Sequence, residues 1–337
     1  MAGMPPGSFF LQKAVGSTAD MPTEALEAAL GTLRSGRVPL LGQIEVTREC
    51  SFRCPFCYAR PLAGKRPMTT DRIIDLLGEV VEAGCVSLLL TGGEPLGHPD
   101  FARIYSHAAR LGVVMYVETN AHSISDGTLN ALEEFPPANV AASLYAATDA
   151  GYKAVTGHGA ARRRVMENID RLLSHRIAVS LRTPICKLNF GELEALLAFS
   201  AARGLSHSLN FHLFPRQDGE PVGRDTAFSV QELLSLQDSA DLARTTRDRI
   251  RRFLGGLSRP AKTFCHDGVN AFYVNAYGEL VFCTRRWEDV TATEQLGFRA
   301  AWELRGQRGL ARRGEEWVCR QRDERGICHY WEETVTQ

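Results

Sequence analysis

A regular alternation of short apolar runs with amphipathic stretches occupies this chain from about residue 43 to residue 212. The apolar runs, such as SLLL at 87–90 and VVMYVE at 113–118, have the length of buried strands. The stretches between them carry apolar residues three and four apart, as at Ile73, Leu77 and Val80, which is the period of a helix. Strands that alternate with helices form parallel sheets through right-handed crossovers. The alternation therefore predicts an α/β fold.

Six β/α-type units are expected in this region. The predicted strands are at 43–47, 87–90, 113–118, 139–143, 178–183 and 208–212, and the predicted helices between them at 70–83, 101–111, 125–134, 161–175 and 190–203. Six units over roughly 170 residues are too few for a closed eight-fold barrel, which typically needs about 250. We therefore expect an open, partial (β/α)6 TIM-like barrel.

The remaining segments divide the chain into four expected parts. They are an N-terminal extension at 1–40 with a helix at 23–33, the barrel at 41–215, a linker at 216–260 with a helix at 229–254, and a small cysteine-rich extension at 261–337. The last part begins with a predicted β-hairpin at 271–283, where a Gly-containing turn separates two apolar strands. The chain beyond this hairpin is expected to be irregular.

Composition excludes several classes of protein. Lys+Arg and Asp+Glu both number 39, so the basic excess expected of a nucleic-acid-binding protein is absent, and the Arg-rich stretch at 305–325 is interleaved with acidic residues as on a solvated face. No apolar run approaches the ~20 residues that span a bilayer, and the first residues lack the features of a signal peptide. We therefore expect a cytoplasmic protein with no membrane partner. Clustered cysteines in that compartment are typically metal ligands or catalytic groups.

Three of the nine cysteines lie on one short loop. Cys50, Cys54 and Cys57 form C-x3-C-x2-C directly after the first predicted strand, at the edge of the sheet where active sites gather. Three thiolates can bind three irons of a cubane cluster and leave the fourth iron open. A structural zinc ion is the alternative, but zinc requires four ligands and no fourth Cys or His is near in sequence. A disulfide with one spare thiol is a further alternative.

The loop resembles the signature of the radical S-adenosylmethionine (SAM) superfamily, C-x3-C-x-aromatic-C, with Phe56 as the aromatic residue. TGGEP at 91–95, one β/α unit later, resembles the GGEP motif of that family. The resemblance implies a SAM-binding 4Fe-4S cluster on Cys50, Cys54 and Cys57. It also implies S-adenosylmethionine as cosubstrate, cleaved reductively to a 5′-deoxyadenosyl radical that abstracts a substrate hydrogen.

The resemblance also indicates residues that contact SAM. In the family a Glu holds the SAM amino group, a Thr-Asn pair lies near SAM, and aromatic residues flank the adenine; here Tyr145 and Ala146 replace the Asp-Gly that usually follows the serine of the fourth strand. Two glycines would let the backbone approach the ligand, and an arginine could pair with the SAM carboxylate. The expected SAM-binding residues are Phe56, Tyr58, Gly92, Gly93, Glu94, Asn120, Ser143 and Arg182.

A second set of cysteines lies in the last quarter of the chain. Cys265, Cys283, Cys319 and Cys328 follow the spacing x17, x35 and x8 and accompany G-x4-C at 278–283. This region resembles the SPASM and twitch extensions of radical SAM enzymes, which implies one auxiliary 4Fe-4S cluster on these four residues. A four-thiolate zinc site or two disulfides are the alternatives. Of the two remaining cysteines, Cys85 is expected in the core and Cys186 near the edge of the sheet that carries the site.

Relatives with such extensions mostly modify peptides. The resemblance therefore favours oxidative modification or crosslinking of a ribosomally synthesised peptide, with flavodoxin or ferredoxin as the external electron donor. The alternatives are dehydrogenation or rearrangement of a small metabolite and, in another class, a non-catalytic zinc or iron–sulfur protein. About 40 residues precede the first predicted strand, too few for the winged-helix leader-binding domain of many peptide-modifying relatives. Asp218, Asp267 and Tyr273 are unranked candidates for a general base.

Overall fold

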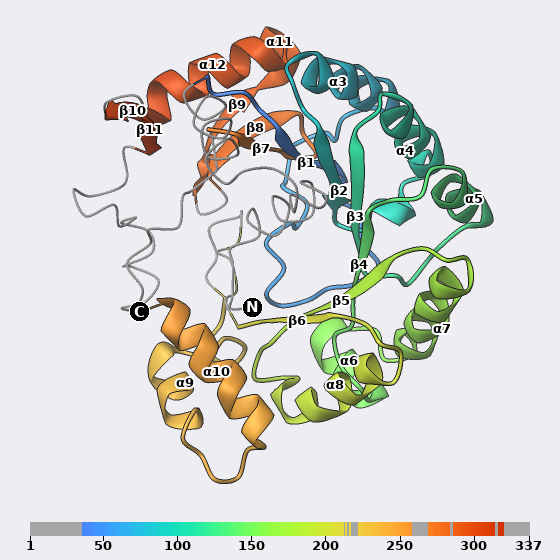
Figure 1. Ribbon diagram of the computed structural model, residues 1–337, viewed down its shortest axis with the longest axis vertical. Helices are drawn as coiled ribbons and strands as arrows, with labels where there is room; N and C mark the ends of the chain where they lie inside the picture. Colours follow the sequence, from blue (N-terminus) through green and yellow to red (C-terminus); the bar gives the residue numbers. More distant parts are fainter. Residues whose placement is uncertain are drawn as a thin grey trace, which may run out of the picture.

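The computed structural model describes residues 36–211, 213, 216, 222–257, 269–283, 286–313 and 316–319. Its centre is a curved nine-stranded sheet in the order β6-β5-β4-β3-β2-β1-β7-β8-β9, with helices along its outer face (Figure 1). The strands of this sheet are β1 Leu41–Thr47, β2 Ser87–Gly92, β3 Val114–Thr119, β4 Asn139–Ser143, β5 Val179–Pro184, β6 His207–Asn210, β7 Ala271–Val274, β8 Glu279–Cys283 and β9 Arg286–Ala292.

Strands β1 to β6 pair in parallel, each with the next along the chain. A helix joins each of them to the following strand, as the alternation of apolar runs predicts. The helices of this part are α3 Thr70–Glu82, α4 Phe101–Arg110, α5 Asp126–Glu134, α6 Asp149–Thr156, α7 Ala161–Ser174 and α8 Leu193–Ala201. The arrangement is a partial (β/α)6 barrel, so the expected fold class is confirmed.

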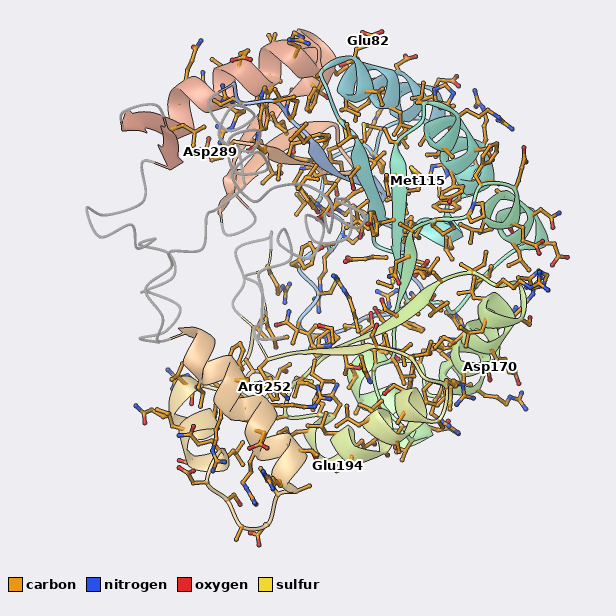
Figure 2. All side chains as sticks on the ribbon, in the orientation of Figure 1. Glu82, Met115, Asp170, Glu194, Arg252 and Asp289 are labelled. Carbon is orange, nitrogen blue, oxygen red and sulfur yellow. The ribbon has the colours of Figure 1, made fainter. Side chains whose placement is uncertain are left out.

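The two faces of the sheet differ in character. Ile44 and Val46 of β1 belong to the apolar core between the sheet and the helices, which also contains Met115 of β3 (Figure 2). Glu45 lies between them in sequence and therefore points to the opposite, inner face, where it is fully buried. Outside the core, Glu82 and Asp170 are exposed on the outer surfaces of α3 and α7 (Figure 2). The barrel thus carries polar side chains on the face that it encloses.

The predicted hairpin at 271–283 is confirmed, and it extends the barrel sheet. Strand β7 pairs in parallel with β1, with Ile44 opposite Val274, and β8 pairs antiparallel with β7. The first strand of the barrel is therefore flanked on both sides, by β2 and by β7. This arrangement brings the turn between β7 and β8 to the same end of β1 as the cysteine loop.

The expectation of an irregular chain after this hairpin is wrong. The structure places there β9, α11 Thr293–Leu296, α12 Phe298–Gly309 and a second hairpin of β10 Leu310–Arg313 and β11 Glu316–Cys319. Helix α12 buries Phe298, Ala301, Trp302 and Arg305, which are spaced as one face of a helix. The buried face includes an arginine, which hides the apolar period in the sequence.

Two further details differ from the sequence prediction. Helix α6 was not expected, although it has a Thr148 side-chain cap at its start and a left-handed Gly157 (φ 75°) at its end. The single helix expected at 229–254 is instead two, α9 Val230–Leu236 and α10 Arg244–Leu257. The helix expected at 23–33 lies outside the described residues. Every helix that the structure describes is too short or too polar to cross a lipid bilayer.

Candidate active site

The cysteine loop and the GGEP loop lie side by side at the carboxyl ends of neighbouring strands. Cys50, Cys54 and Cys57 follow β1, and Gly93 and Glu94 follow β2, which pairs in parallel with β1. The backbone N–H of Gly93 donates to the carbonyl of Thr47 at 2.8 Å, and that of Glu94 donates to the carbonyl of Glu49 at 2.8 Å. The start of the cysteine loop is therefore held by the loop that follows the next strand.

The three thiols are free and close enough to influence one another. Cys50 is exposed, Cys54 is buried and Cys57 is half-buried, and the N–H of Cys57 donates to the carbonyl of Cys54 at 3.1 Å. Burial raises the pKa of the Cys54 thiol well above its usual value, and the charges of Cys57 and Cys50 raise it further. Burial also raises the pKa of Cys57. Such thiols ionise when a metal ion binds them, because metal-bound sulfur is deprotonated.

Two N–H donors are directed at the sulfur of Cys50. The backbone N–H of Phe52 lies 3.3 Å from Sγ, and Nδ2 of Asn120 lies 3.5 Å from it. The other amide atom of Asn120, Oδ1, accepts from the N–H of His122 at 2.8 Å, which orients the amide so that its NH2 group faces the sulfur. N–H donors of this kind stabilise a thiolate ligand and are one of the levers on cluster potential.

These residues fit a cluster held by three thiolates. Within the described residues, no three His, Cys, Asp or Glu side chains converge as ligands of a single ion would. Cysteines that hold a cubane cluster bind different irons, so they need only lie together on one loop. The loop from Cys50 to Cys57 has three thiols and N–H donors, and its one exposed thiol is Cys50.

The structure explains Gly92 and Gly93 by backbone packing. Gly92 has φ 146°, and a Cβ there would lie 2.2 Å from the carbonyl oxygen of Thr47. A Cβ on Gly93 would lie 2.4 Å from the carbonyl oxygen of Glu49 and 2.6 Å from that of Arg48. In the described structure these glycines let the two loops approach each other, and their expected contact with a ligand stays a prediction.

Replacing Gly93 with alanine is expected to lower the free energy of unfolding by about 1–3 kcal/mol, because a methyl group would be forced against fixed backbone atoms. Gly97 of the same loop is the matched control, since its Cβ would meet only the Glu94 side chain at 3.7 Å. Gly97→Ala should change stability by no more than about 0.5 kcal/mol. Urea unfolding of the two variants measures the difference, and equal stabilities would contradict the packing argument.

Glu94 is buried and tied to the end of β3. Its Oε1 accepts from the N–H of Leu96 at 3.0 Å and from Oγ1 of Thr119 at 2.5 Å, and its Oε2 accepts from the N–H of Asn120 at 2.6 Å. A carboxylate has about four lone-pair positions, so an ammonium group could still be accepted. Burial raises the pKa of Glu94 to about 7, although these hydrogen bonds oppose the rise.

The raised pKa of Glu94 predicts a pH dependence of stability in the metal-free protein. The folded state holds this proton more tightly than the unfolded state, so the contribution is full below pH 4.5 and is lost as the pH rises through about 7. The loss amounts to at most about 3 kcal/mol. The Glu94→Gln variant should lose this part of the pH dependence of the free energy of unfolding, because an amide does not titrate; any cost of the amide itself is the same at every pH. Unfolding free energies of both proteins between pH 4.5 and 8 test this, and parallel curves would contradict it.

The other expected SAM-binding residues line the inner side of this region. Phe56 is buried 6.4 Å from the ring of Tyr145, and Tyr58 is half-buried with its pKa raised by burial and by the nearby charges of Glu45 and Glu118. Ser143 ends β4 beside Arg182 of β5. Arg182 forms an ion pair with Glu118 across the inner face. The sequence did not indicate Glu118 as a partner, because nothing in the chain order links the two strands.

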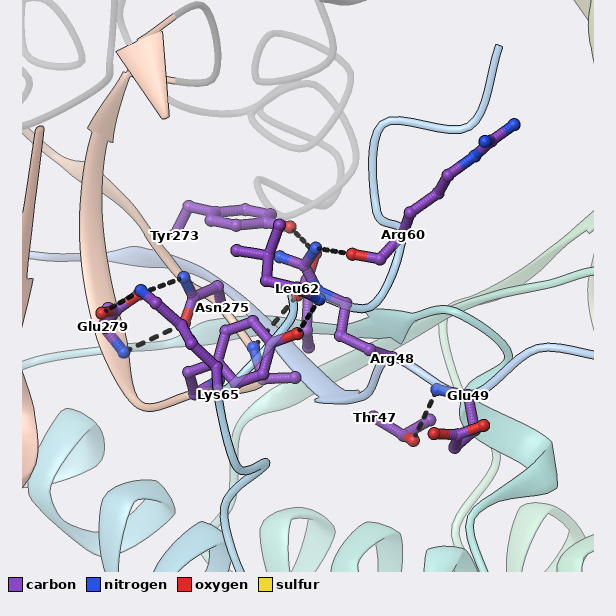
Figure 3. Close-up of polar contacts among 12 residues, drawn as sticks. Thr47, Arg48, Glu49, Arg60, Leu62, Lys65, Tyr273, Asn275 and Glu279 are labelled. Carbon is purple, nitrogen blue, oxygen red and sulfur yellow. Dashed lines mark hydrogen bonds and ion pairs between the residues drawn. The ribbon is translucent and has the colours of Figure 1, made fainter. Parts of the chain in front are cut away.

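A buried polar network joins the cysteine loop to the turn between β7 and β8. Nε of Arg48 donates to Glu45, whose carboxylate also accepts from the phenol of Tyr273 and from the N–H of Ala276. Nη1 of Arg48 donates to the carbonyl of Arg60 at 3.0 Å (Figure 3). Glu45, Arg48 and Tyr273 are all buried. The hairpin therefore fixes the path of the chain that carries the cysteines.

The turn after β7 makes two more contacts with this chain segment. The phenol of Tyr277 accepts from the N–H of Leu62 at 2.7 Å. Lys65 forms an ion pair with Glu279 at 2.6 Å (Figure 3). Tyr273 was a candidate general base. Burial and the charge of Glu45 raise the pKa of Tyr273 well above its usual value, and its phenol already donates a hydrogen bond to that carboxylate. Tyr273 is therefore unsuited to act as a general base.

Two of the four cysteines of the second set lie within the described residues. Cys283 ends β8 and Cys319 ends β11, while Cys265 and Cys328 lie outside the described residues, as do the base candidates Asp218 and Asp267. Cys85 and Cys186 are both buried and free, as expected for Cys85. The ligands of an auxiliary site remain a prediction from the sequence.

The cysteine loop and Glu94 lie in a region of the barrel that a known family model matches. Residues 44–200 match the family model of the Radical SAM superfamily, so this region, which holds the cysteine loop and Glu94, belongs to that superfamily. The family implies a 4Fe-4S cluster and SAM, and the residues around Cys50, Cys54 and Cys57 fit such a cluster.

Similar proteins include peptide-modifying and nucleotide-cyclising relatives. The chain is 27% identical over 146 residues to a PqqA peptide cyclase of Bradyrhizobium diazoefficiens. The aligned region covers 42% of this chain and 38% of that protein. The chain is also 27% identical over 174 residues to a probable GTP 3′,8-cyclase of Thermococcus kodakarensis, covering 51% of this chain and 56% of that protein. The chain thus spans only about half the length of these relatives, or less.

Among solved structures, SuiB of Streptococcus suis bound to its precursor peptide SuiA has the same fold. The TM-score is 0.64 at 15% identity, over 88% of this chain and 77% of that chain. The likeness extends beyond the region matched by the family model, because 88% coverage reaches well past residues 44–200.

Proposed function

We propose that this chain is a radical SAM enzyme that oxidatively modifies or crosslinks a ribosomally synthesised peptide. The observation that carries the proposal is the pairing of a three-thiol loop with a buried Glu94 at the carboxyl ends of β1 and β2. When bound, the cluster and SAM supply a 5′-deoxyadenosyl radical that abstracts a hydrogen atom from the substrate. An external one-electron donor, such as flavodoxin or ferredoxin, completes the system.

The chain's own residues would bind and orient these groups. Cys50, Cys54 and Cys57 would hold three irons of the cluster, so that the fourth iron would remain open to SAM. Glu94 presents a carboxylate for the amino group, and its bonds to Thr119 and Asn120 fix that carboxylate in place.

The adenine and carboxylate ends of SAM would meet other side chains of the barrel. Phe56 and Tyr58 offer aromatic faces, and Arg182 presents a guanidinium that Glu118 holds at the inner face of the sheet. Gly92 and Gly93 act indirectly in this proposal, because they set the distance between the GGEP loop and the cysteine loop.

An auxiliary 4Fe-4S cluster on Cys265, Cys283, Cys319 and Cys328 would serve the second half of an oxidation. An oxidation that begins with the loss of a hydrogen atom requires the loss of one more electron, which a cluster held by these cysteines would be suited to accept. The hairpin that ends in Cys283 is joined to β1 through β7, so such a cluster would be attached to the same sheet as the SAM site.

A peptide substrate is favoured by the PqqA peptide cyclases that resemble this chain and by the fold that it shares with SuiB. The second candidate is a small metabolite, because the GTP 3′,8-cyclase relative is equally similar in sequence. The region that matches the family model carries the cysteine loop and Glu94, which in this proposal bind SAM rather than the substrate.

Anaerobic reconstitution tests the proposed activity. Protein loaded with iron and sulfide should bind about eight irons per chain if two clusters form, and it should release 5′-deoxyadenosine from SAM when reduced with dithionite. About four irons with one zinc would instead indicate a zinc site in the C-terminal extension. Iron-loaded protein that cleaves no SAM under reduction would contradict the proposal.

Mass spectrometry distinguishes the two substrate classes. Short peptides encoded beside the gene are incubated with the reduced enzyme and SAM, and a crosslink or oxidation removes two hydrogen atoms from the peptide. Turnover of a metabolite extract, with every such peptide unchanged, would support the small-molecule candidate.

A further inference from the structure

Two segments beside the SAM site are basic in a chain whose charges balance. Residues 50–66 contain Arg53, Arg60, Lys65 and Arg66 and no carboxylate, although Lys+Arg and Asp+Glu both number 39 in the whole chain. Residues 150–166 contain Lys153 and the three arginines at 162–164, again with no carboxylate. Each of these two segments therefore carries a net positive charge.

These two segments are in direct contact. The backbone N–H of Arg53 donates to the carbonyl of Thr156 at 2.8 Å. The buried ring of Phe52 packs edge-on against Tyr152 at 6.2 Å and lies 6.2 Å from the ring of His158. The end of α6 is thus fixed to the loop that carries the three cysteines, and Arg53 lies beside the end of α6.

Three exposed cations and two histidines make up the surface that we call the basic rim: Arg53, Lys153, Arg164, His122 and His158. The rings of His122 and His158 are 4.9 Å apart, and the charge of Arg164 reaches His122, whose pKa is lowered by burial, by His158 and by Arg164. Within the described part of the chain, none of the three cations forms an ion pair.

The carboxylates near the basic rim do not neutralise it. Asp149 is held by Arg162 at 2.6 Å, and Glu167 lies 3.7 Å from Arg163. Glu49 is the exposed carboxylate on the cysteine loop itself, next to Cys50. The net charge of the surface is therefore positive, and it adjoins Cys50, the one exposed thiol of the three.

We propose that the basic rim is the docking surface for an acidic one-electron carrier protein that reduces the SAM-binding cluster. The proposal rests on the proposed function, because a cluster that cleaves SAM must receive an electron from outside the chain. One electron passes from the reduced carrier to the oxidised cluster, so that the carrier loses one electron and the cluster gains one. Arg53 precedes Cys54 by one residue and follows Cys50 by three, so a carrier bound at Arg53 would lie next to the cysteine loop.

Charge complementarity at such a surface acts mainly on the rate of encounter. Opposite potentials raise association rates by factors of roughly ten to a thousand at low salt, and the gain is lost as ionic strength rises. An acidic segment of a substrate peptide could use the same charges, but the rim's position around the exposed ligand Cys50 favours the electron carrier.

The test compares two drivers of the same reaction. SAM cleavage by reconstituted protein is measured with reduced flavodoxin, whose surface is acidic, and with dithionite, which needs no docking surface. The variant is Lys153→Glu/Arg164→Glu, and the matched control is Arg103→Glu/Arg252→Glu, which changes net charge equally on α4 and α10. The ratio of the flavodoxin-driven to the dithionite-driven rate should fall at least about tenfold in the rim variant at low salt and by less than twofold in the control.

A binding titration of flavodoxin with the metal-free protein supplies a second readout. Two results together support the proposal: the rim variant alone loses binding of flavodoxin, and added salt weakens the binding of flavodoxin to the wild type. An unchanged rate ratio, or lost binding of an acidic peptide with flavodoxin binding intact, overturns it. If wild-type protein cleaves no SAM even with dithionite, the proposed function fails, and the titration still decides whether the rim binds flavodoxin.

Discussion

Cys54→Ala protein, reconstituted without oxygen, is expected to bind about four fewer irons per chain than the wild type and to release no 5′-deoxyadenosine above the enzyme-free rate. Cys54 is the buried member of the three thiols, and its pKa is raised by burial and by the charges of Cys57 and Cys50. Removing it leaves two ligands for a cluster that already lacks a fourth. Iron analysis and chromatography of the SAM products measure the two losses.

Two other cysteines provide matched controls for this prediction. Cys85 is buried away from the loop, where its thiol donates to the carbonyl of Ser87 at 3.3 Å, so Cys85→Ala should keep all of the iron and the SAM cleavage. Cys283→Ala should lose only the iron of the proposed auxiliary site. If Cys54→Ala retained full iron and cleavage, the SAM-binding cluster would have other ligands.

The parts of the fold that local sequence determines were predictable. Strands β2 and β3 were predictable from their apolar runs, because a parallel strand that is buried on both faces carries adjacent apolar residues. The three thiols and Glu94 were also identified from local motifs. Their proximity follows from the parallel pairing of β1 and β2, which places the ends of successive strands together.

The features that depend on distant parts of the chain were not predictable. The network that supports the cysteine loop joins Glu45 to Tyr273, 228 residues later in the sequence. The packing role of the GGEP glycines could not be predicted, because a motif does not show that the carbonyls of Arg48 and Glu49 occupy the space beside Gly93. Helix α12 was missed because Arg305 occupies a buried position on its apolar face.

The buried pair of Glu45 and Arg48 links the cysteine loop to the β7–β8 hairpin. The loop begins at the end of β1, and Arg48 reaches forward to the carbonyl of Arg60, while Nη2 of Arg60 donates to the carbonyl of Cys54 at 3.0 Å. Arg48 is 1% exposed and Glu45 is 0% exposed. Charges at that depth are stable only when each has its partner, so the pair is held in one arrangement.

Arg48→Met is therefore expected to lower the free energy of unfolding of the metal-free protein by about 3–5 kcal/mol, because it leaves the Glu45 carboxylate buried without its cation. Glu45→Gln should cost a similar amount by isolating Arg48. The double variant should cost less than the sum of the two by about 0.5–3 kcal/mol, because neither single charge remains. Urea unfolding of the four proteins gives the coupling directly.

A surface pair shows what burial contributes to this result. Arg103 and Asp71 lie 2.8 Å apart with 57% and 79% of their side chains exposed, so Arg103→Met should cost no more than about 1 kcal/mol. Tyr273→Phe removes one donor to Glu45 but no charge, and it should cost about 1–3 kcal/mol. If Arg48→Met were no more costly than Arg103→Met, the pair would not be holding the loop. If Tyr273→Phe also lowered the iron content of the SAM site, the hairpin would act on the cluster through this hydrogen bond.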